Sequence, residues 1–311
     1  MKRADPAWCI CQGLYVLNRA EADELMFFKR MRTRAVAAPQ DRFNDSDWLN
    51  LVMHSDADPL LTALFALIQN SVIGARAKRP EDYGYSSGHV LDASKHPYMM
   101  VQSVGYVADI IGLLAPPMFQ NANDGGFLSF LHSTTPSLVL GRAALAVDEL
   151  GQDAAFLTAR QLTYFRPGMY IRHLVPTTMG LKAWLFAAIK LITPQFPVTS
   201  ELEGPVKDAY AALERGVAGA EREHLAAVVS KLLQHGTALD LKRWVAAVDL
   251  TADRVGLIFS DDLQTAVQLI RAGGEEASSV PIAERVKELF RYEVSEGYFG
   301  IRSRLRIAID S

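Results

Sequence analysis

The spacing of apolar residues constrains the fold of this 311-residue chain more than any other feature. Along most of the chain, apolar side chains recur at the three- and four-residue intervals of amphipathic helices. Between residues 116 and 141 the apolar runs are short and are separated by turn residues, which is typical of strands. We therefore expect an α+β domain that is mostly helical and contains one small sheet.

The helical spacing predicts a series of separate helices. The clearest runs from Pro59 to Ile73, because Asp58 and Pro59 form a start signal and leucines recur on one face. The other helices are expected over residues 21–34, 97–113, 153–165, 179–192, 204–215, 220–235, 239–272 with a break near Ser260, and 282–296.

The segment from Arg76 to Lys95 lacks this spacing. It contains Gly84, Gly88 and paired serines, which are typical of a surface loop or a boundary. We consider two arrangements, an N-terminal helical region (1–95) followed by a second domain (96–311), and one continuous domain.

Three short apolar runs predict the small sheet. They cover residues 116–121, 127–133 and 137–141, with turn residues between them. We expect a meander, in which each strand pairs with its neighbour in the chain. The third run consists of Ser137, Leu138, Val139, Leu140 and Gly141.

Charge content disfavours nucleic acid and anionic lipid as partners. The chain has 32 basic and 35 acidic residues, with a formal net charge of −3, and it has no block of five or six like charges. The basic footprint that such partners require is therefore missing.

Cysteine and apolar content indicate a cytoplasmic protein. Cys9 and Cys11 are too close in sequence to form an unstrained disulfide, which favours free thiols in a reducing compartment. The apolar stretches 98–118 and 181–192 are interrupted by polar residues or are shorter than the roughly 20 residues that cross a bilayer. We expect buried helices there and no integral membrane segment.

Four stretches carry a common motif pattern. Residues 249–257 read Asp-Leu-Thr-Ala-Asp-Arg-Val-Gly-Leu. Residues 153–164 form a helix-like run, residues 137–145 a strand and turn before it, and residues 281–298 contain a proline, Arg-Val-Lys-Glu-Leu and Ser-Glu-Gly-Tyr. Together these stretches resemble the gluzincin zinc peptidases of the CAAX-prenyl-protease type, which have an HExxH metal helix and a later E-x-x-A-D-R-x-G-L helix. The chain also resembles a domain appended to large bacterial tetratricopeptide-repeat proteins.

The resemblance implies a zincin-like fold with a degenerate active-site helix. It places the HExxH positions on residues 160–164, which read Arg-Gln-Leu-Thr-Tyr, and the third zinc ligand on Asp249. Arginine cannot ligate a cation, glutamine is not a base at neutral pH, and tyrosine is a poor ligand. A slip of one residue would place Ala159 and Thr163 in the histidine positions, and no slip places a histidine there.

The former site therefore consists of five degenerate positions and implies no catalytic residue, no metal and no cofactor. The chain's seven histidines include no pair at the i, i+4 spacing of a metal helix. The degenerate positions are Arg160, Gln161, Tyr164, Asp249 and Asp253.

Loss of zinc with retention of Asp249 and Asp253 would leave negative charge in a partly dry site. We therefore predict that the helix over 153–165 packs against the helix that carries these two residues. Arg160 should form a salt bridge with Asp249 or Asp253, with Gln161 or Tyr164 completing the hydrogen bonds.

The function expected from these features is that of a pseudoenzyme. We expect a non-catalytic metallopeptidase-like domain for protein interaction or scaffolding, with a protein or peptide partner that adds to an exposed strand at 127–133 or 137–141. The alternatives are an active metal-dependent peptidase or hydrolase with a non-standard site, and a structural tail of a repeat protein. Near the C-terminus, the alternating Arg302, Arg304 and Arg306 predict a solvated face.

Overall fold

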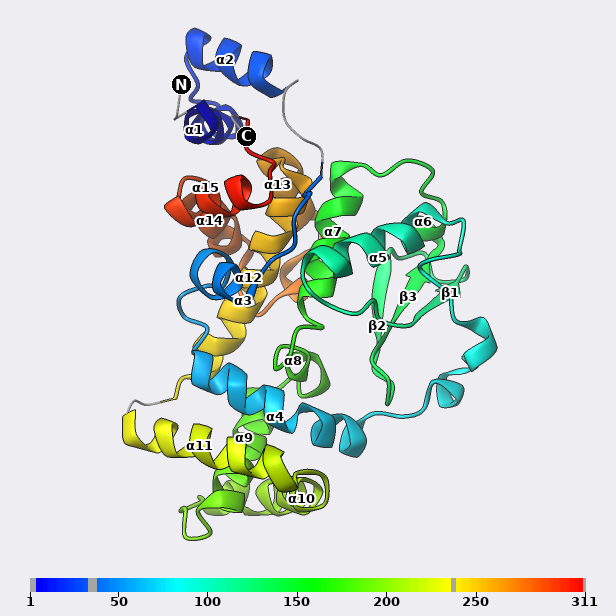
Figure 1. Ribbon diagram of the computed structural model, residues 1–311, viewed down its shortest axis with the longest axis vertical. Coiled ribbons are helices and arrows are strands. Elements are labelled where there is room, and N and C mark those ends of the chain that lie inside the picture. The colour runs from blue at the N-terminus through cyan, green and yellow to red at the C-terminus, as the bar shows by residue number, and fades with distance from the viewer. Residues whose placement is uncertain (1–3, 33–37, 236–238, 310–311) are drawn as a thin grey trace.

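The computed structural model describes residues 4–32, 38–235 and 239–309. The fold is mostly helical with one three-stranded sheet, as the spacing predicts (Figure 1). The helices are α1 (Ala4–Val16), α2 (Ala22–Arg32), α3 (Asp45–Asp47), α4 (Pro59–Arg76), α5 (Met99–Ile110), α6 (Arg142–Leu145), α7 (Gln152–Thr163), α8 (Ile171–Leu174), α9 (Thr178–Ile192), α10 (Ser200–Gly216), α11 (Gly219–His235), α12 (Leu241–Ser260), α13 (Leu263–Ala272), α14 (Ile282–Glu293) and α15 (Glu296–Arg304).

Shorter elements connect these helices. The strands are β1 (Met118–Asn121), β2 (Leu128–Leu131) and β3 (Ser137–Gly141). A π-helical turn, η1 (Trp48–Val52), precedes α4, and the 3-10 turns are η2 (Pro80–Tyr83), η3 (Ser87–His89) and η4 (Glu275–Ala277). The segment 76–95 is thus largely loop, as predicted.

The expected break near Ser260 has a clear local cause. Asp261 adopts a left-handed conformation with φ 48°, which ends α12. The next residue, Asp262, caps α13 by accepting a hydrogen bond from the Thr265 N–H. Consecutive aspartates therefore end one helix and begin the next.

The strand order is β1-β3-β2, so the predicted meander is wrong. β1 and β3 are parallel, and β2 and β3 are antiparallel. The N–H of Leu138 donates to the Pro117 carbonyl on the β1 side, and the N–H of Gly141 donates to the Phe127 carbonyl on the β2 side, each at 2.9 Å.

The prediction of a peptide-binding edge at residues 137–141 is therefore also wrong. Ser137, Leu138, Val139, Leu140 and Gly141 form the central strand, which is buried along its whole length and paired on both sides. A central strand covered on both faces is apolar without alternation, and this run has that character. No additional strand can pair with it.

β1 and β2 are the two edge strands of the described sheet, and on β1 Leu91 forms a single bridge with Met118. β2 pairs with β3 and has no partner on its other side among the described residues. Since Gly141 donates to Phe127, these two residues form a hydrogen-bonded pair of the antiparallel ladder. Pairs of this type alternate with pairs whose N–H and C=O groups point away from the partner strand. The backbone groups of Leu128 and Phe130 consequently face the free side of β2.

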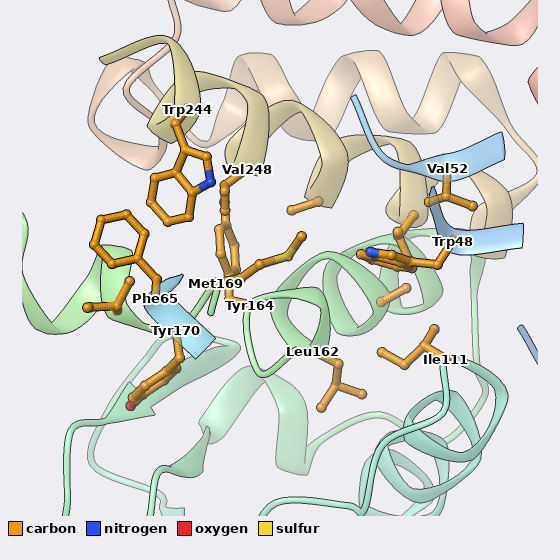
Figure 2. Packing of buried hydrophobic residues seen from close by; sticks show 14 of the residues in the cluster. Trp48, Val52, Phe65, Ile111, Leu162, Tyr164, Met169, Tyr170, Trp244 and Val248 are labelled. Carbon is orange, nitrogen blue, oxygen red and sulfur yellow. The ribbon is translucent and has the colours of Figure 1, made fainter. Parts of the chain in front are cut away.

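One hydrophobic core joins the two ends of the chain, reaching from Trp8 to Ile307. Figure 2 shows its centre, where Trp244 and Phe65 pack near Tyr164 and Met169. In Figure 1, α7 and α12 lie in the middle, the sheet and α5 lie on one side, α4 and α9 to α11 lie below, and the two termini lie above. Helices before and after residue 95 share this core.

Of the described helices, only α4 is long and apolar enough to cross a membrane. Its residues Leu61, Leu64, Phe65 and Ile68 are buried, and it packs against α10 and α11. α4 is accordingly a helix of the protein core.

The predicted solvated face near the C-terminus is wrong for one of its three arginines. Arg302 is fully buried, where it donates to both carboxylate oxygens of Asp5 and to Asp261. Its guanidinium also lies over the rings of Trp8 and Tyr298. Arg304 and Arg306 are exposed and pair with Asp41. Arg302 thus fastens α1 to α15 and to the end of α12.

The cluster around Arg302 holds more carboxylates than cations. Glu293 accepts a hydrogen bond from the Gln12 amide and is fully buried, and burial raises its pKa well above the usual range. Burial also raises the pKa of Asp261 to about 6, against the opposing charge of Arg302.

A carboxylate whose pKa is raised on folding stabilises the folded state most at low pH. This contribution is complete below the unfolded pKa near 3.9 and is lost as pH rises through the folded pKa of about 6. We expect Asp261→Asn to flatten the fall in unfolding free energy between roughly pH 4 and 7, since the amide does not titrate and asparagine tolerates positive φ. Urea unfolding at several pH values measures this. A profile parallel to that of the wild type would contradict the assignment.

Candidate functional site

Helices α7 and α12 form the most extensive helix contact among the described residues, as the resemblance predicts. Gly256 of α12 makes this approach possible, because an added Cβ would lie 2.8 Å from the ring of Phe156 on α7. The close contact brings a row of polar side chains on α7 against Asp249 and Asp253 on α12.

Asp253 is fully buried and accepts hydrogen bonds from two arginines. Arg160 Nε donates to Asp253 Oδ1 at 2.7 Å. Arg285 of α14 makes two further bonds to the same carboxylate, at 2.7 and 2.8 Å. The predicted salt bridge of Arg160 is confirmed, and a second guanidinium shares its partner.

Arg160 uses its other donors within the protein. One Nη group bonds to the hydroxyl of Tyr164 at 3.3 Å and to the carbonyl of Ala277 at 2.9 Å. Tyr164 then donates to Asp249 Oδ1 at 3.0 Å. Tyr164 therefore completes the hydrogen bonds as predicted and links the two carboxylates.

Asp249 is also fully buried, and its charge is compensated by a bidentate ion pair. Arg172 of α8 donates to both of its oxygens, at 2.7 and 2.8 Å. Ser278 and Ser279, in the loop before α14, add hydrogen bonds of 2.7–2.9 Å to Oδ2. Burial raises the pKa of Asp249, but Arg172 and the two serines outweigh this effect and lower it to about 2.

The sequence predicts the contacts between α7 and α12 in this centre, but it does not predict the partners that come from α8, α14 and the loop before α14. Arg160, Tyr164, Asp249 and Asp253 come together, whereas Gln161 lies half-buried on α7 and takes no part in the network. Of the two registers considered, the one that uses positions 160 and 164 faces α12. In the other, Thr163 donates to the backbone carbonyl of Ala159.

Three elements supply the partners that the sequence analysis does not assign. Arg285 is the first residue of the Arg-Val-Lys-Glu-Leu motif, so the motif could have indicated that it lies near the site. Arg172 and the serine pair lie outside every motif. The sequence therefore gives no specific signal for Arg172, Ser278 or Ser279.

An aromatic cluster adjoins this centre on the side of β2. Phe130 of β2 contacts Tyr164 edge-on and the ring of His173 at 4.3 Å. His132 Nδ1 lies 3.0 Å from the Tyr170 hydroxyl. Burial, assisted by Arg172, lowers the pKa of His173 to about 3, so this imidazole is neutral at neutral pH.

The charges of the centre are compensated internally, and its titratable groups keep one protonation state near neutral pH. Asp249 stays ionised and His173 stays neutral near pH 7, while burial raises the pKa of Tyr164 and keeps its hydroxyl protonated. None of these three groups changes protonation where a general acid or base must. Within the described residues, no group of three or more His, Cys, Asp or Glu side chains is placed to hold a metal ion.

Comparisons with protein-family models, curated proteins and solved structures give no match to this chain. The likeness to gluzincin peptidases therefore rests on the sequence motifs, and it stays a hypothesis.

Removal of Arg160 tests the strength of the network. The sequence alone predicts a cost of about 3–5 kcal/mol for an uncompensated buried carboxylate. Because Arg285 still binds Asp253, we expect Arg160→Ala to lower the unfolding free energy by only about 2–3 kcal/mol. Asp253→Ala leaves two buried guanidinium groups without their shared partner and should cost about 3–5 kcal/mol.

Denaturant titration of both variants measures these costs. The matched control is Arg215→Ala, since Arg215 is exposed on α10 and its one side-chain bond to the described part of the chain goes to a backbone carbonyl of its own helix. Arg215→Ala should lie within about 0.5 kcal/mol of the wild type. An equally small effect of Arg160→Ala would show that the network does not stabilise the fold.

Proposed function

We propose that this chain is a non-catalytic, metallopeptidase-like domain that binds an extended segment of a partner protein. The observation that carries the proposal is the ion-pair network of Arg160 and Tyr164 with Asp253 and Asp249. These residues stand at positions where the resemblance expects zinc ligands and their partner. A pseudoenzyme that acts in protein interaction or scaffolding is the function most consistent with this network.

The network supports the absence of catalysis because it fills the centre. Tyr164, Asp249 and Asp253 are each at most 1% exposed. Arg160 carries a permanent positive charge that a zinc ion at the same place would have to displace. A divalent cation would therefore meet two carboxylates already occupied by arginines.

The free side of β2 supports the binding half of the proposal. The outward N–H and C=O groups of Leu128 and Phe130 offer an extended peptide the start of a new ladder. β2 is also the strand that contacts α7, so the added peptide would lie near the degenerate centre. β2 lies within residues 127–133, the other stretch expected to present an exposed strand, and it is the docking strand of the proposal.

We also place the domain in the cytoplasm as part of this proposal. Cys9 and Cys11 are both free thiols and are buried in the core. Such thiols are typical of proteins in a reducing compartment.

Metal content and proteolysis test the catalytic half. Purified protein should contain no stoichiometric zinc by elemental analysis and should not cleave casein. Protein incubated with zinc and dialysed should give the same result, since the carboxylates are held by arginines. Stoichiometric zinc together with cleavage that a chelator abolishes would establish the active metal-dependent peptidase instead.

A proline on the free side of β2 tests the binding half. Peptides selected from a displayed random library should bind in an extended form, and Leu128→Pro should weaken them by about tenfold or more. Proline there removes an outward N–H and leaves the β2–β3 bonds intact. Leu128→Ala is the matched control, since it shortens the same side chain and keeps the N–H. Equal binding by both variants would exclude β2 as the docking strand.

A further inference from the structure

A cavity of about 400 Å³ lies between α4, η1 and the loop that follows α7, and none of the five degenerate positions lines it. Its volume is within the range of small-molecule sites in proteins. Most of its walls are apolar or small, and the exceptions are Arg166 and Asp45. The lining residues are Asp45, Trp48, Leu49, Met53, Pro59, Thr62, Ala63, Ala66, Arg166, Pro167 and Met169.

Arg166 is a buried cation with few partners. Its side chain is only 15% exposed, and its guanidinium lies over the Trp48 ring at 4.1 Å. Among the described residues, it makes one side-chain hydrogen bond, from Nη1 to the Ile111 carbonyl at 2.7 Å. Its nearest carboxylate is Asp45, at 3.9 Å, and that side chain is 99% exposed. Water therefore competes with Arg166 for this carboxylate.

The contrast with the other arginines of the core is informative. Arg160 and Arg172 each donate to a buried carboxylate at 2.7 Å. For both, burial lowers the pKa, but the facing oxygens outweigh it and raise the pKa overall. Burial lowers the pKa of Arg166 without such compensation, because Asp45 offsets little of it. Arg166 is thus a desolvated cation whose strong partner is missing.

The local structure holds Arg166 rigidly at the cavity. Gly168, with φ 84°, lets the loop after α7 lie directly on α4, and an added Cβ would be 2.3 Å from the Thr62 carbonyl. Gln69 of α4 accepts a hydrogen bond from the Gly168 N–H. The π-helical turn supplies Trp48, which lies against the guanidinium, and Leu49, which is 55% exposed. The cavity is therefore lined by the cation together with apolar residues of this turn.

We propose that this cavity binds a small molecule with an apolar body and a single carboxylate group. The ligand's carboxylate pairs with Arg166 in place of Asp45, and its apolar part lies against Trp48, Met53 and the small residues of α4. A carboxylate suits this position because guanidinium donors bind it in a planar arrangement. The charge complementarity and the apolar walls select against inorganic anions and neutral polar solutes.

Decanoate is the probe, and decanamide is its neutral counterpart of the same length. Calorimetric titration should detect saturable binding of decanoate with one site per chain. Decanamide should bind at least about tenfold more weakly, since it cannot pair with the guanidinium. The proposal does not depend on the peptide-binding function, because no residue of β2 lines this cavity.

Three variants locate the site. Arg166→Gln should weaken decanoate by about tenfold or more and leave decanamide unchanged. Asp45→Asn removes the competing carboxylate and should tighten decanoate by a few fold. Ala66→Leu fills the cavity from α4 and should abolish binding of both compounds.

Equal affinity for the two probes in the wild-type protein would overturn the proposal, as would no binding of decanoate. Unchanged decanoate binding in Ala66→Leu would place the site elsewhere and likewise refute it. Circular dichroism establishes that each variant folds. If Arg166→Gln does not fold, the comparison of probes in the wild type and in Asp45→Asn still decides the outcome.

Discussion

Two carboxylates on α12, Asp249 and Asp253, lie where water does not reach them, and the elements around them are arranged to compensate their charge. An isolated buried carboxylate is too costly to persist, so each must have cationic or hydrogen-bonding partners. The partners come from α7, α8, α14 and the loop before α14, through Arg160, Arg172, Arg285 and two serines. Distant parts of the chain are thus positioned against one helix by one electrostatic requirement. The same helix ends at Asp261, whose charge faces Arg302.

The helices were largely predictable because burial of one face leaves a regular trace in the sequence. The break near Ser260 was also predicted, and the structure shows its cause in two consecutive aspartates, of which Asp261 ends α12 and Asp262 caps α13. Strand order was not, because three short runs contain no information on which of them lies in the middle. The even burial of Ser137–Gly141 marks a central strand only once its neighbours are known. Helix α1 was missed because its spacing is weak, and its docking depends on Arg302 near the other end of the chain.

The candidate site was predictable as far as a charge argument reaches. Two buried carboxylates need a cationic partner, and the expected alignment placed Arg160 in the helix turn that faces them. The argument could not count the compensating groups, because Arg172 and Arg285 approach from segments whose placement follows from the tertiary fold. Arg166 illustrates the same limit from the opposite side. Its sequence neighbourhood resembles that of any loop arginine, and only the packing shows that it lacks a strong partner.

The contact between Arg302 and Asp5 has a consequence for how the protein is made. The two residues are separated by almost the whole described chain, and Ile309 also donates to Asp5. α1 therefore cannot reach its final place until α15 has left the ribosome. At ordinary rates of synthesis this takes on the order of tens of seconds. During that interval Trp8 and Cys9, which are buried in the folded protein, remain exposed to solvent and to other chains. Among the described helices, α1 is synthesised first and is among the last to be protected, so it is the one that a chaperone would have the longest opportunity to bind.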